Sequence, residues 1–305
     1  MSNPLLSTVD LKKILAGAQL PALPQSAIRL LELSQDAKNG PNEFAVPIET
    51  DPGLTGQVLK FVNSSYFGFS REISSVKLAI TLVGVRTIKN FALWSAVFSL
   101  MPNPQCGPFD LNSLWQDSLR RALFARAMAT LLGLKEAEEP FAAALLQDMA
   151  IPLLAKEAPE VYVKLIEARH DGKFRLSALE QAVFGWTHAD AAGIMARQWN
   201  LPDDFAVLVE NHQAIDHWVA QADRAPGNLA VAMSALLPAV ADPVWRECQS
   251  FEACYAKVYP SQSPTVAELL AQVDGEFAEF APLLRIDTPG KSLADSYQEV
   301  TAPAE

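Results

Sequence analysis

Cysteine and long apolar runs are both scarce in this 305-residue chain. Its three cysteines, Cys106, Cys248 and Cys254, form no CxxC pair, so neither a disulfide framework nor a zinc ribbon is predicted. No run of eighteen apolar residues occurs, and residues 1–10 lack the basic region, apolar stretch and cleavage site of a secretory signal. We therefore expect a cytoplasmic protein that does not use a membrane as a partner.

An excess of positive charge is also absent. The net charge at pH 7 is -11. Residues 1–110 carry nine Lys and Arg against eight Asp and Glu, so the acidity lies in the rest of the chain. This balance opposes nucleic-acid binding, because a phosphate backbone is bound by a concentrated basic surface. We expect no nucleic-acid partner.

Strand patterns are nearly absent as well, since branched apolar and polar residues alternate in no sustained way. Helical spacing of apolar residues is common instead. It occurs in Ile28–Leu33, Leu54–Val62, Ile88–Phe98, Leu119–Leu132 and Phe205–Val209. The sequence therefore predicts an all-α fold, a two-subdomain helical bundle.

Capping patterns refine where these helices begin. An Asp followed by Pro supplies an acceptor at the N-cap and a first helical residue that needs no donor partner. A Ser or Thr followed three residues later by an acidic residue has the spacing of a capping box. These patterns predict helix starts at Asp51-Pro52, Ser177 with Glu180, and Thr187 with Asp190.

A break in the middle of the chain suggests the domain boundary. Residues 101–108 contain three prolines and a glycine and are typical of a linker. We expect an N-terminal helical subdomain over 1–107 and a second helical subdomain over 108–287. Residues 288–305 are polar without an evident cap, and we expect a flexible tail.

Four blocks of sequence then resemble one family in content and order. They are LPALPQSAIRLLEL, IETDPGLTGQVLKFVNSSYFG, ISSVKLAITLVGVRTIKNFAL and ALEQAVFGWTHADAAGIMARQWNLP. The resemblance as a whole spans about Leu20 to His212. They resemble the signature blocks of HDOD domains, bacterial signalling domains derived from the metal-dependent HD phosphohydrolases. The resemblance implies that the second subdomain is HD-like and that the protein acts in signalling without an established catalytic activity.

The second block contains a turn with two possible roles. Asn63 and Ser64 are turn formers, and Tyr66 and Phe67 follow them. The aromatic side chains can anchor this turn on the bundle. Alternatively, the four residues form a partner-binding loop. The sequence favours the packing role and leaves the second one open.

The resemblance also locates the metal site of the ancestral enzymes. An active HD phosphohydrolase holds divalent cations through imidazoles and carboxylates from several helices. The His-Asp doublet corresponds to Gln147-Asp148, so an amide replaces its imidazole. Asp117 occupies the place of the first histidine ligand, and His188 and His212 match two further histidine positions.

The last carboxylate of that site is missing, because residues 230–236 contain no acidic residue and Ser234 is the suggested equivalent. The four remaining candidates could form a mixed metal site, but we expect a vestigial pocket that holds no metal. The pocket should then gather Asp117, Gln147, Asp148, His188 and His212, with Asp148 the most buried and hydrogen-bonded to a neighbour.

No other catalytic pattern competes, since GxGxxG, P-loop, GxSxG and HExxH motifs are all absent. The leading interpretation is a non-catalytic signalling protein without a cofactor. Its partners would be other proteins or a second copy of the chain. The alternative is a residual metal-dependent phosphohydrolase or a nucleotide-binding protein of the HD superfamily.

Overall fold

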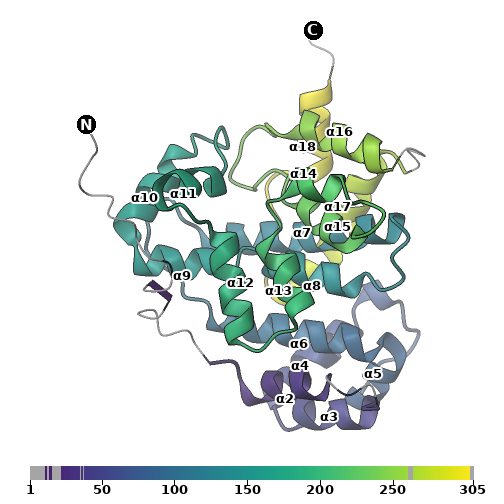
Figure 1. The fold of residues 1–305 in the computed structure, drawn as a ribbon. Helices are drawn as coiled ribbons and strands as arrows, with labels where there is room; N and C mark the ends of the chain where they lie inside the picture. The colour runs from purple at the N-terminus through teal and green to yellow at the C-terminus, as the bar shows by residue number, and fades with distance from the viewer. Residues whose placement is uncertain are drawn as a thin grey trace.

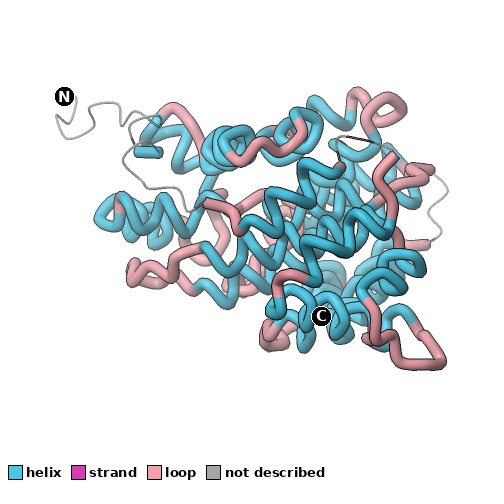
Figure 2. Tube along the Cα trace, turned by 90° about the horizontal axis from the view of Figure 1, so that it is seen from below, coloured by secondary structure: helices cyan, strands magenta, loops and turns pink. Residues whose placement is uncertain are grey.

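A computed structural model describes residues 11, 14–15, 22–34, 36, 38–259 and 264–302. Over these ranges the regular elements are helices, and no strand occurs (Figure 2). The expected all-α fold is confirmed. None of the described helices is both long and apolar enough to cross a membrane. Residues 303–305 of the expected tail and Leu20 of the first block lie outside the described residues.

The N-terminal part is a small bundle of short helices (Figure 1). Apolar side chains such as Ile48, Val58 and Ile80 are almost completely buried between them. The elements are α2 Gln25–Leu33, α3 Pro41–Glu49, α4 Pro52–Val62, the 3-10 turn η1 Ser65–Phe67, α5 Val76–Val83 and α6 Val85–Leu100.

Helix α4 begins where the sequence predicts. One carboxylate oxygen of Asp51 accepts a hydrogen bond from the backbone N–H of Leu54 at 3.0 Å, as an N-cap does. The other oxygen accepts one from the Ser26 hydroxyl of α2 at 3.0 Å. The cap therefore both starts α4 and ties it to α2.

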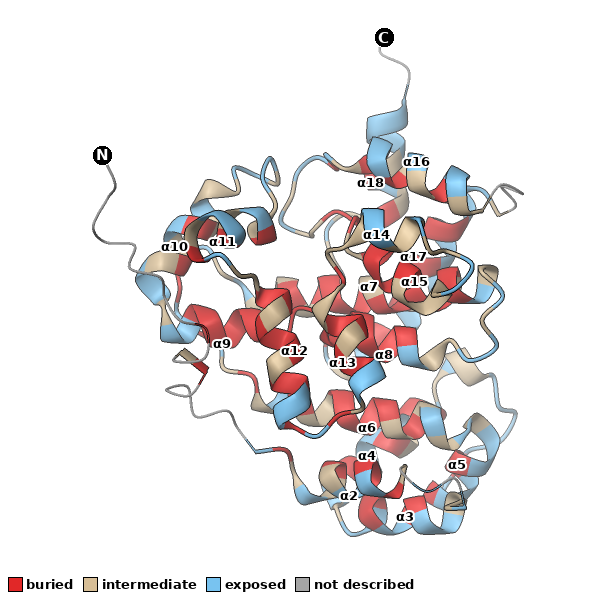
Figure 3. Cartoon of the chain, viewed as in Figure 1, coloured by how far each residue is buried: buried red, intermediate tan, exposed pale blue. Residues whose placement is uncertain are grey.

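The C-terminal part is built around α7, a long helix buried on several sides (Figure 3). Helices α8, α15 and α17 pack against it. The elements are α7 Leu111–Leu131, α8 Glu138–Leu146, α9 Ala150–Glu157, α10 Pro159–Ala168, α11 Leu176–Phe184, α12 His188–Gln198, α13 Asp203–Glu210, α14 Ile215–Val219, α15 Pro226–Ser234, α16 Cys248–Val258, α17 Val266–Leu284 and α18 Leu293–Thr301.

The segment expected as a linker, 101–108, joins α6 to α7 and is packed against α10. Met101 and Cys106 are buried, and the Cys106 thiol lies 3.5 Å from the carbonyl oxygen of Pro159. A Cβ added at Gly107 would lie 3.1 Å from Val163. The prolines prevent a helix here, but these contacts hold the segment on the second subdomain.

Two predicted capping boxes in the second subdomain have opposite outcomes. The one at Thr187 and Asp190 is present at the start of α12 and is confirmed. The one at Ser177 and Glu180 is wrong, because α11 begins one residue earlier, at Leu176, and has no side-chain cap. Glu180 is completely buried and faces the interior instead.

The turn at residues 63–67 joins the two parts of the molecule. The amide of Asn63 donates to the carbonyl of Ile73 at 2.7 Å and accepts from its N–H at 2.6 Å. Tyr66 packs edge-on against Phe280 of α17 with the ring centres 4.5 Å apart. Phe67 packs similarly against Phe61. These contacts agree with the first of the two predicted roles, in which the aromatic side chains anchor the turn on the bundle.

The end of the chain differs from the expected flexible tail. Residues 293–301 form α18, which begins with a capping box of Ser292 and Asp295 and packs on α17. Leu293 is completely buried, and its backbone N–H donates to Asp274 at 3.0 Å. The segment has few apolar residues. The buried Leu293, the capping box and the hydrogen bond to Asp274 nevertheless hold it against α17.

Candidate functional site

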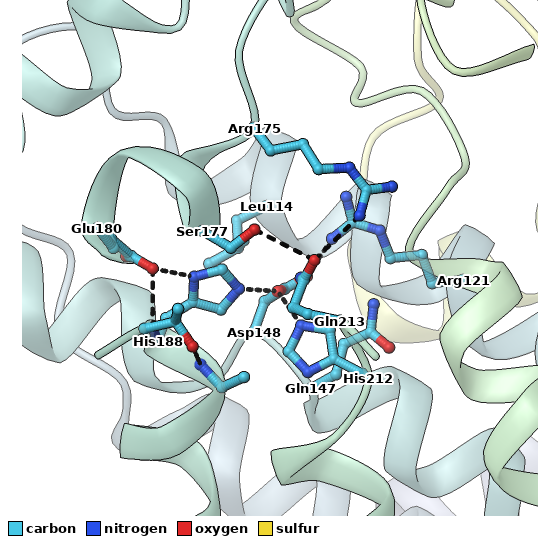
Figure 4. A network of polar contacts seen from close by, with 12 residues as sticks. Leu114, Arg121, Gln147, Asp148, Arg175, Ser177, Glu180, His188, His212 and Gln213 are labelled. Carbon is cyan, nitrogen blue, oxygen red and sulfur yellow. Dashed lines mark hydrogen bonds and ion pairs between the residues drawn. The ribbon is translucent and has the colours of Figure 1, made fainter. Parts of the chain in front are cut away.

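Four charged or polar side chains from four different places in the chain meet beside the middle of α7 (Figure 4). Asp148 lies in the turn between α8 and α9, and His188 is the first residue of α12. His212 lies just after α13, and Arg121 belongs to α7 itself. The two histidines and Asp148 are each at most 3% exposed. The bundle thus brings them together away from bulk water.

Asp148 lies in contact with the other three side chains. The Arg121 guanidinium donates to its Oδ2. The Nε2 atoms of His188 and His212 lie 3.2 Å and 3.6 Å from its Oδ1. Burial by itself raises the pKa of Asp148, but Arg121 and the two histidines more than offset it and hold the pKa well below its usual range. Asp148 is therefore ionised.

His188 lies between two carboxylates. Its Nδ1 is 2.6 Å from Oε2 of Glu180, which also accepts the backbone N–H of His188 at 2.8 Å. The Tyr162 hydroxyl donates to the other Glu180 oxygen at 2.8 Å. Burial lowers the pKa of His188, but Glu180 and Asp148 outweigh it and raise the pKa to about 10. His188 is therefore an imidazolium at neutral pH.

His212 has the opposite charge state. Its Nδ1–H donates to the carbonyl oxygen of Val209 at 2.7 Å, which fixes the tautomer and leaves Nε2 as a bare lone pair. Burial is the main cause that lowers the pKa of His212 to about 4. A neutral imidazole thus directs its lone pair toward Asp148.

The other two predicted pocket residues lie at the edges of this group. Asp117 accepts the backbone N–H of Val240 at 2.8 Å, and burial raises its pKa to about 6 despite the nearby Arg121. Gln147 is turned away from the charges, and its Oε1 accepts the Ser234 hydroxyl at 3.3 Å. Gln147 stands where the imidazole of the doublet is expected, and Ser234 is the suggested equivalent of the missing carboxylate. These two neutral side chains therefore contact each other.

The structure thus brings Asp148, His188 and His212 to one point, with donor atoms within 4.8 Å of one another. Asp117 lines the same cavity as Asp148. Asp148 has the expected neighbours, but it is not the most buried of the five. It is 3% exposed, against 0% for Gln147 and 1% for His212, because it keeps a face toward the cavity.

Sequence reasoning missed Arg121 and Glu180. A signal for Arg121 existed, since it stands four residues after Asp117 and therefore on the same face of α7. Glu180 was assigned to a capping box, which explained the residue without requiring burial. Glu180 lies on a mostly apolar helix and completes no cap there. Such a carboxylate needs a buried partner, which here is His188.

A cavity of about 190 Å³ opens on the outer side of Asp148. One part of its wall is apolar and comes from helices α7, α9, α10 and α11, with Leu114, Ile151, Ile166 and Leu176. Another part is charged and includes Arg169 and Arg175. The charged cluster around Asp148 thus forms the inner end of a space that small molecules can enter.

The HDOD domain model matches residues 20–215, which is more than half of the chain. The chain belongs to the HDOD domain family. This family comprises signalling-type proteins on an HD-like helical fold, and the match covers the turn at 63–67 as well as all five predicted pocket residues.

Solved structures of HDOD and related proteins show the same fold at low identity. An HDOD domain protein of unknown function from Geobacter sulfurreducens superposes with a TM-score of 0.71 at 19% identity, covering 90% of this chain and 95% of its own. A "Putative phosphohydrolase" from Shewanella amazonensis SB2B gives 0.70 at 18%, covering 92% and 98%. A "Putative signal transduction protein" from Marinobacter aquaeolei VT8 gives 0.68 at 18%, covering 93% and 68%.

The chain spans 38% and 28% of the lengths of two curated relatives that it matches. Those proteins are therefore much longer than the shared region.

The HD-like fold of this HDOD protein raises the question of whether its pocket fits a metal ion. Ligand distances of about 2.1 Å place neighbouring donor atoms roughly 3.0 to 3.4 Å apart around one cation. The 3.2 Å separation between His188 and Asp148 falls within that spacing, and the 3.6 Å separation between His212 and Asp148 lies slightly above it. Glu180 on His188 and the Val209 carbonyl on His212 also orient the rings as the partners of metal-binding histidines do.

The charges of the pocket do not fit a metal as well as the distances do. A cation needs Asp148 free and His188 deprotonated. Here the Arg121 guanidinium already holds Asp148, and two carboxylates hold the proton on His188. Arg121 and His188 lie against Asp148, and His188 also lies against Glu180, so each of these groups has an opposite charge beside it. The residues therefore do not fit the two-cation site of a hydrolase, and a single cation has to displace a guanidinium and a proton.

Proposed function

We propose that this HDOD protein is a non-hydrolytic signal-transduction domain that acts through contacts with other proteins. The observation that carries the proposal is the ion-paired cluster of Arg121, Asp148, His188 and Glu180. In this cluster Asp148, which lies within 3.6 Å of both histidines, is the partner of a guanidinium. Hydrolysis by an HD enzyme depends instead on a metal-bound water. Here the carboxylate that would hold the metal is already paired with a guanidinium.

An exposed apolar surface on the N-terminal part supports a protein partner. Leu78 and Leu82 lie one turn apart on α5 and are 45% and 46% exposed, and Val46 of the neighbouring α3 is 60% exposed. Large apolar side chains that stay in water on adjacent helices are typical of contact surfaces. This surface also allows the chain to bind a second copy of itself.

The proposal is tested by two measurements on the purified protein. Hydrolysis of cyclic dinucleotides and guanosine polyphosphates should be absent with or without added Mn²⁺. A Gln147→His variant serves as the matched comparison, because it restores the imidazole of the doublet. Turnover by the wild-type protein that chelation removes would contradict the proposal.

The contact surface is tested by sedimentation and crosslinking. A Leu78→Glu, Leu82→Glu double variant should lose self-association or binding to a purified partner, since it places charges in the apolar surface. An Arg29→Glu variant on α2 is the control, because Arg29 is exposed and its ion pair among the described residues is with its helix neighbour Glu32. Equal association of both variants would contradict a role for this surface.

A second candidate is a mononuclear metal-dependent phosphohydrolase. The observation in its favour is the set of three donor atoms at Asp148, His188 and His212. It requires Arg121 to leave Asp148. Metal analysis distinguishes the two candidates, because the first predicts no stoichiometric metal and the second predicts about one equivalent.

A further inference from the structure

Two arginines that line the cavity carry buried N–H groups without an acceptor. Arg121 uses Nη1 for Asp148, but its Nε has no hydrogen-bond partner among the described residues. Arg175, just before α11, binds Glu247 through Nε and Gln213 through Nη1 at 3.2 Å, and its buried Nη2 has no partner. A buried guanidinium N–H without an acceptor is costly, so these groups point to an acceptor supplied by a ligand.

The position of these donors agrees with one ligand head group. Figure 4 shows the Arg121 and Arg175 side chains extending toward the space beside Asp148, with Ser177 and Gln213 nearby. The Ser177 hydroxyl donates to Gln213 at 3.2 Å, to the same oxygen that Arg175 contacts. Guanidinium groups bind carboxylates and phosphates through paired N–H donors, so an oxyanion matches this end of the cavity.

The rest of the cavity sets the kind of molecule that carries the oxyanion. Its volume of about 190 Å³ is below the roughly 300 Å³ of pockets that enclose drug-sized ligands. Leu114, Ile151, Ile166 and Leu176 line another part of its wall. These dimensions suit a small anion with an apolar body and leave too little room for a dinucleotide.

Ion pairs from a strained turn line one side of the cavity. Arg169 donates to both oxygens of Asp242 at 2.8 and 2.7 Å, and Arg175 binds Glu247, so two pairs connect residues 169–175 with residues 242–247. His170 and Asp171 in this turn have positive φ values of 45° and 53°. Left-handed backbone at consecutive non-glycine residues is uncommon and costs energy, as it does at ligand clamps.

We propose that this cavity binds a small organic oxyanion, a carboxylate or phosphomonoester on an apolar body, through Arg121 and Arg175. Glu247 competes with the ligand for Arg175, and the turn at 169–175 covers the bound molecule. This proposal deepens the proposed function by naming its input. It rests on that function only for the statement that the bound anion is not hydrolysed.

The test uses calorimetry with four probes on the full chain in the presence of a chelator. Phenyl phosphate and benzoate represent the two head groups, inorganic phosphate lacks the apolar body, and benzylamine replaces the anion by a cation. At least one of the two aromatic anions should bind at one per chain and more tightly than inorganic phosphate, and benzylamine should not bind. Absence of saturable binding by both aromatic anions, or equal binding of benzylamine, overturns the proposal.

Three variants test the assigned residues. Arg175→Gln should weaken binding about tenfold or more, because it removes one charge-assisted contact. Arg197→Gln on α12 removes a comparable ion pair with Glu210 of α13, outside the cavity, and should bind as the wild type does. Glu247→Gln should bind the anion several-fold more tightly, since it frees Arg175. Unchanged or weaker binding by Glu247→Gln contradicts the proposal even if Arg175→Gln fails to fold.

The same experiment separates failure of this inference from failure of the proposed function. Release of phenol from phenyl phosphate, measured with added Mn²⁺ and no chelator, reports hydrolysis independently of binding. Binding without phenol release agrees with both proposals. Phenol release overturns the proposed function, whereas loss of binding in chelator overturns only the anion site.

Discussion

The two parts of this chain bury different kinds of side chain. In the described residues before 101, Asn90 is the one buried polar or charged side chain, and its amide donates across the boundary to the carbonyl of Glu138 at 2.9 Å. The second part buries Gln116, Asp117, Ser118, Arg120, Arg126, Gln147, Asp148, Ser177, Glu180, His188, His212, Ser234 and Ser296. The difference is larger than the lengths of the two parts explain.

This contrast indicates where function resides in the fold. Buried polar groups are costly to maintain, and an apolar core is sufficient for a helical bundle. The N-terminal part has such a core and offers an apolar surface. The second part retains a buried charged cluster that stability alone does not require. The contrast agrees with the proposals that the first part contacts a protein partner and that the second part binds a ligand.

The largest expected effect breaks the charged cluster. Replacing Asp148 by Ala leaves Arg121 and His188 without their common anion in a buried place. The free energy of unfolding should fall by about 3 to 5 kcal/mol, the range found when one partner of a buried ion pair is removed. Urea denaturation at pH 7 measures it. A loss below about 1 kcal/mol would mean that the cluster is well solvated.

The second effect is a pH dependence that the N-terminal part should lack. The pKa of His188 is about 10 in the folded protein and about 6.5 when unfolded. The stabilisation from this raised pKa is complete below pH 6.5 and is lost as the pH rises toward 10, because the folded state holds a proton that the unfolded state releases. It amounts to a few kcal/mol.

Denaturation of the wild type and of His188→Gln at pH 6.5 and 8.5 checks this expectation. The difference in stability between the two proteins should shrink as the pH rises. A constant difference would show that His188 is neutral in the folded protein.

Part of this picture could be predicted from the sequence, for a definite physical reason. The Asp51 cap and the helical spacing are local patterns, and both appear in the structure. The convergence of Asp148, His188 and His212 followed from family resemblance, because no local pattern reports a contact across 64 residues. Arg121 was missed because an arginine on a helix is usually a solvated surface residue. The fixed end of the chain depends on the burial of Leu293 against other helices, which composition does not reveal.

A smaller effect concerns Asp117. Burial raises its pKa to about 6 from the ordinary value of 3.8, so its ionised form destabilises the folded state. The contribution of Asp117 to the stability of the folded protein is therefore lost as the pH rises from about 4 to about 6, and it is not regained at higher pH. Asp117→Asn should therefore be more stable than the wild type at pH 7.5, by up to about 3 kcal/mol, and equal to it near pH 4. Equal stability at both pH values would contradict the raised pKa.

The smallest effect is a control in the N-terminal part. Ile48→Val removes one methylene group from a completely buried position on α3. It should cost about 0.5 to 1.5 kcal/mol. The cost should be the same at pH 5.5 and pH 8.5, because the neighbouring core carries no buried charge. A pH-dependent cost would show that the two parts are less distinct than their buried residues suggest.

The most direct test of the account is the metal content of the wild-type protein. Protein purified without chelators and equilibrated with Mn²⁺, Fe²⁺ or Zn²⁺ is desalted and measured by elemental analysis beside an Arg121→Ala variant. Because Arg121 and the His188 proton already satisfy Asp148, the wild type should retain well below one equivalent of any metal. The variant, which frees Asp148, should retain more. One or more tightly held equivalents in the wild type would contradict the claim that this pocket balances its charges without a metal.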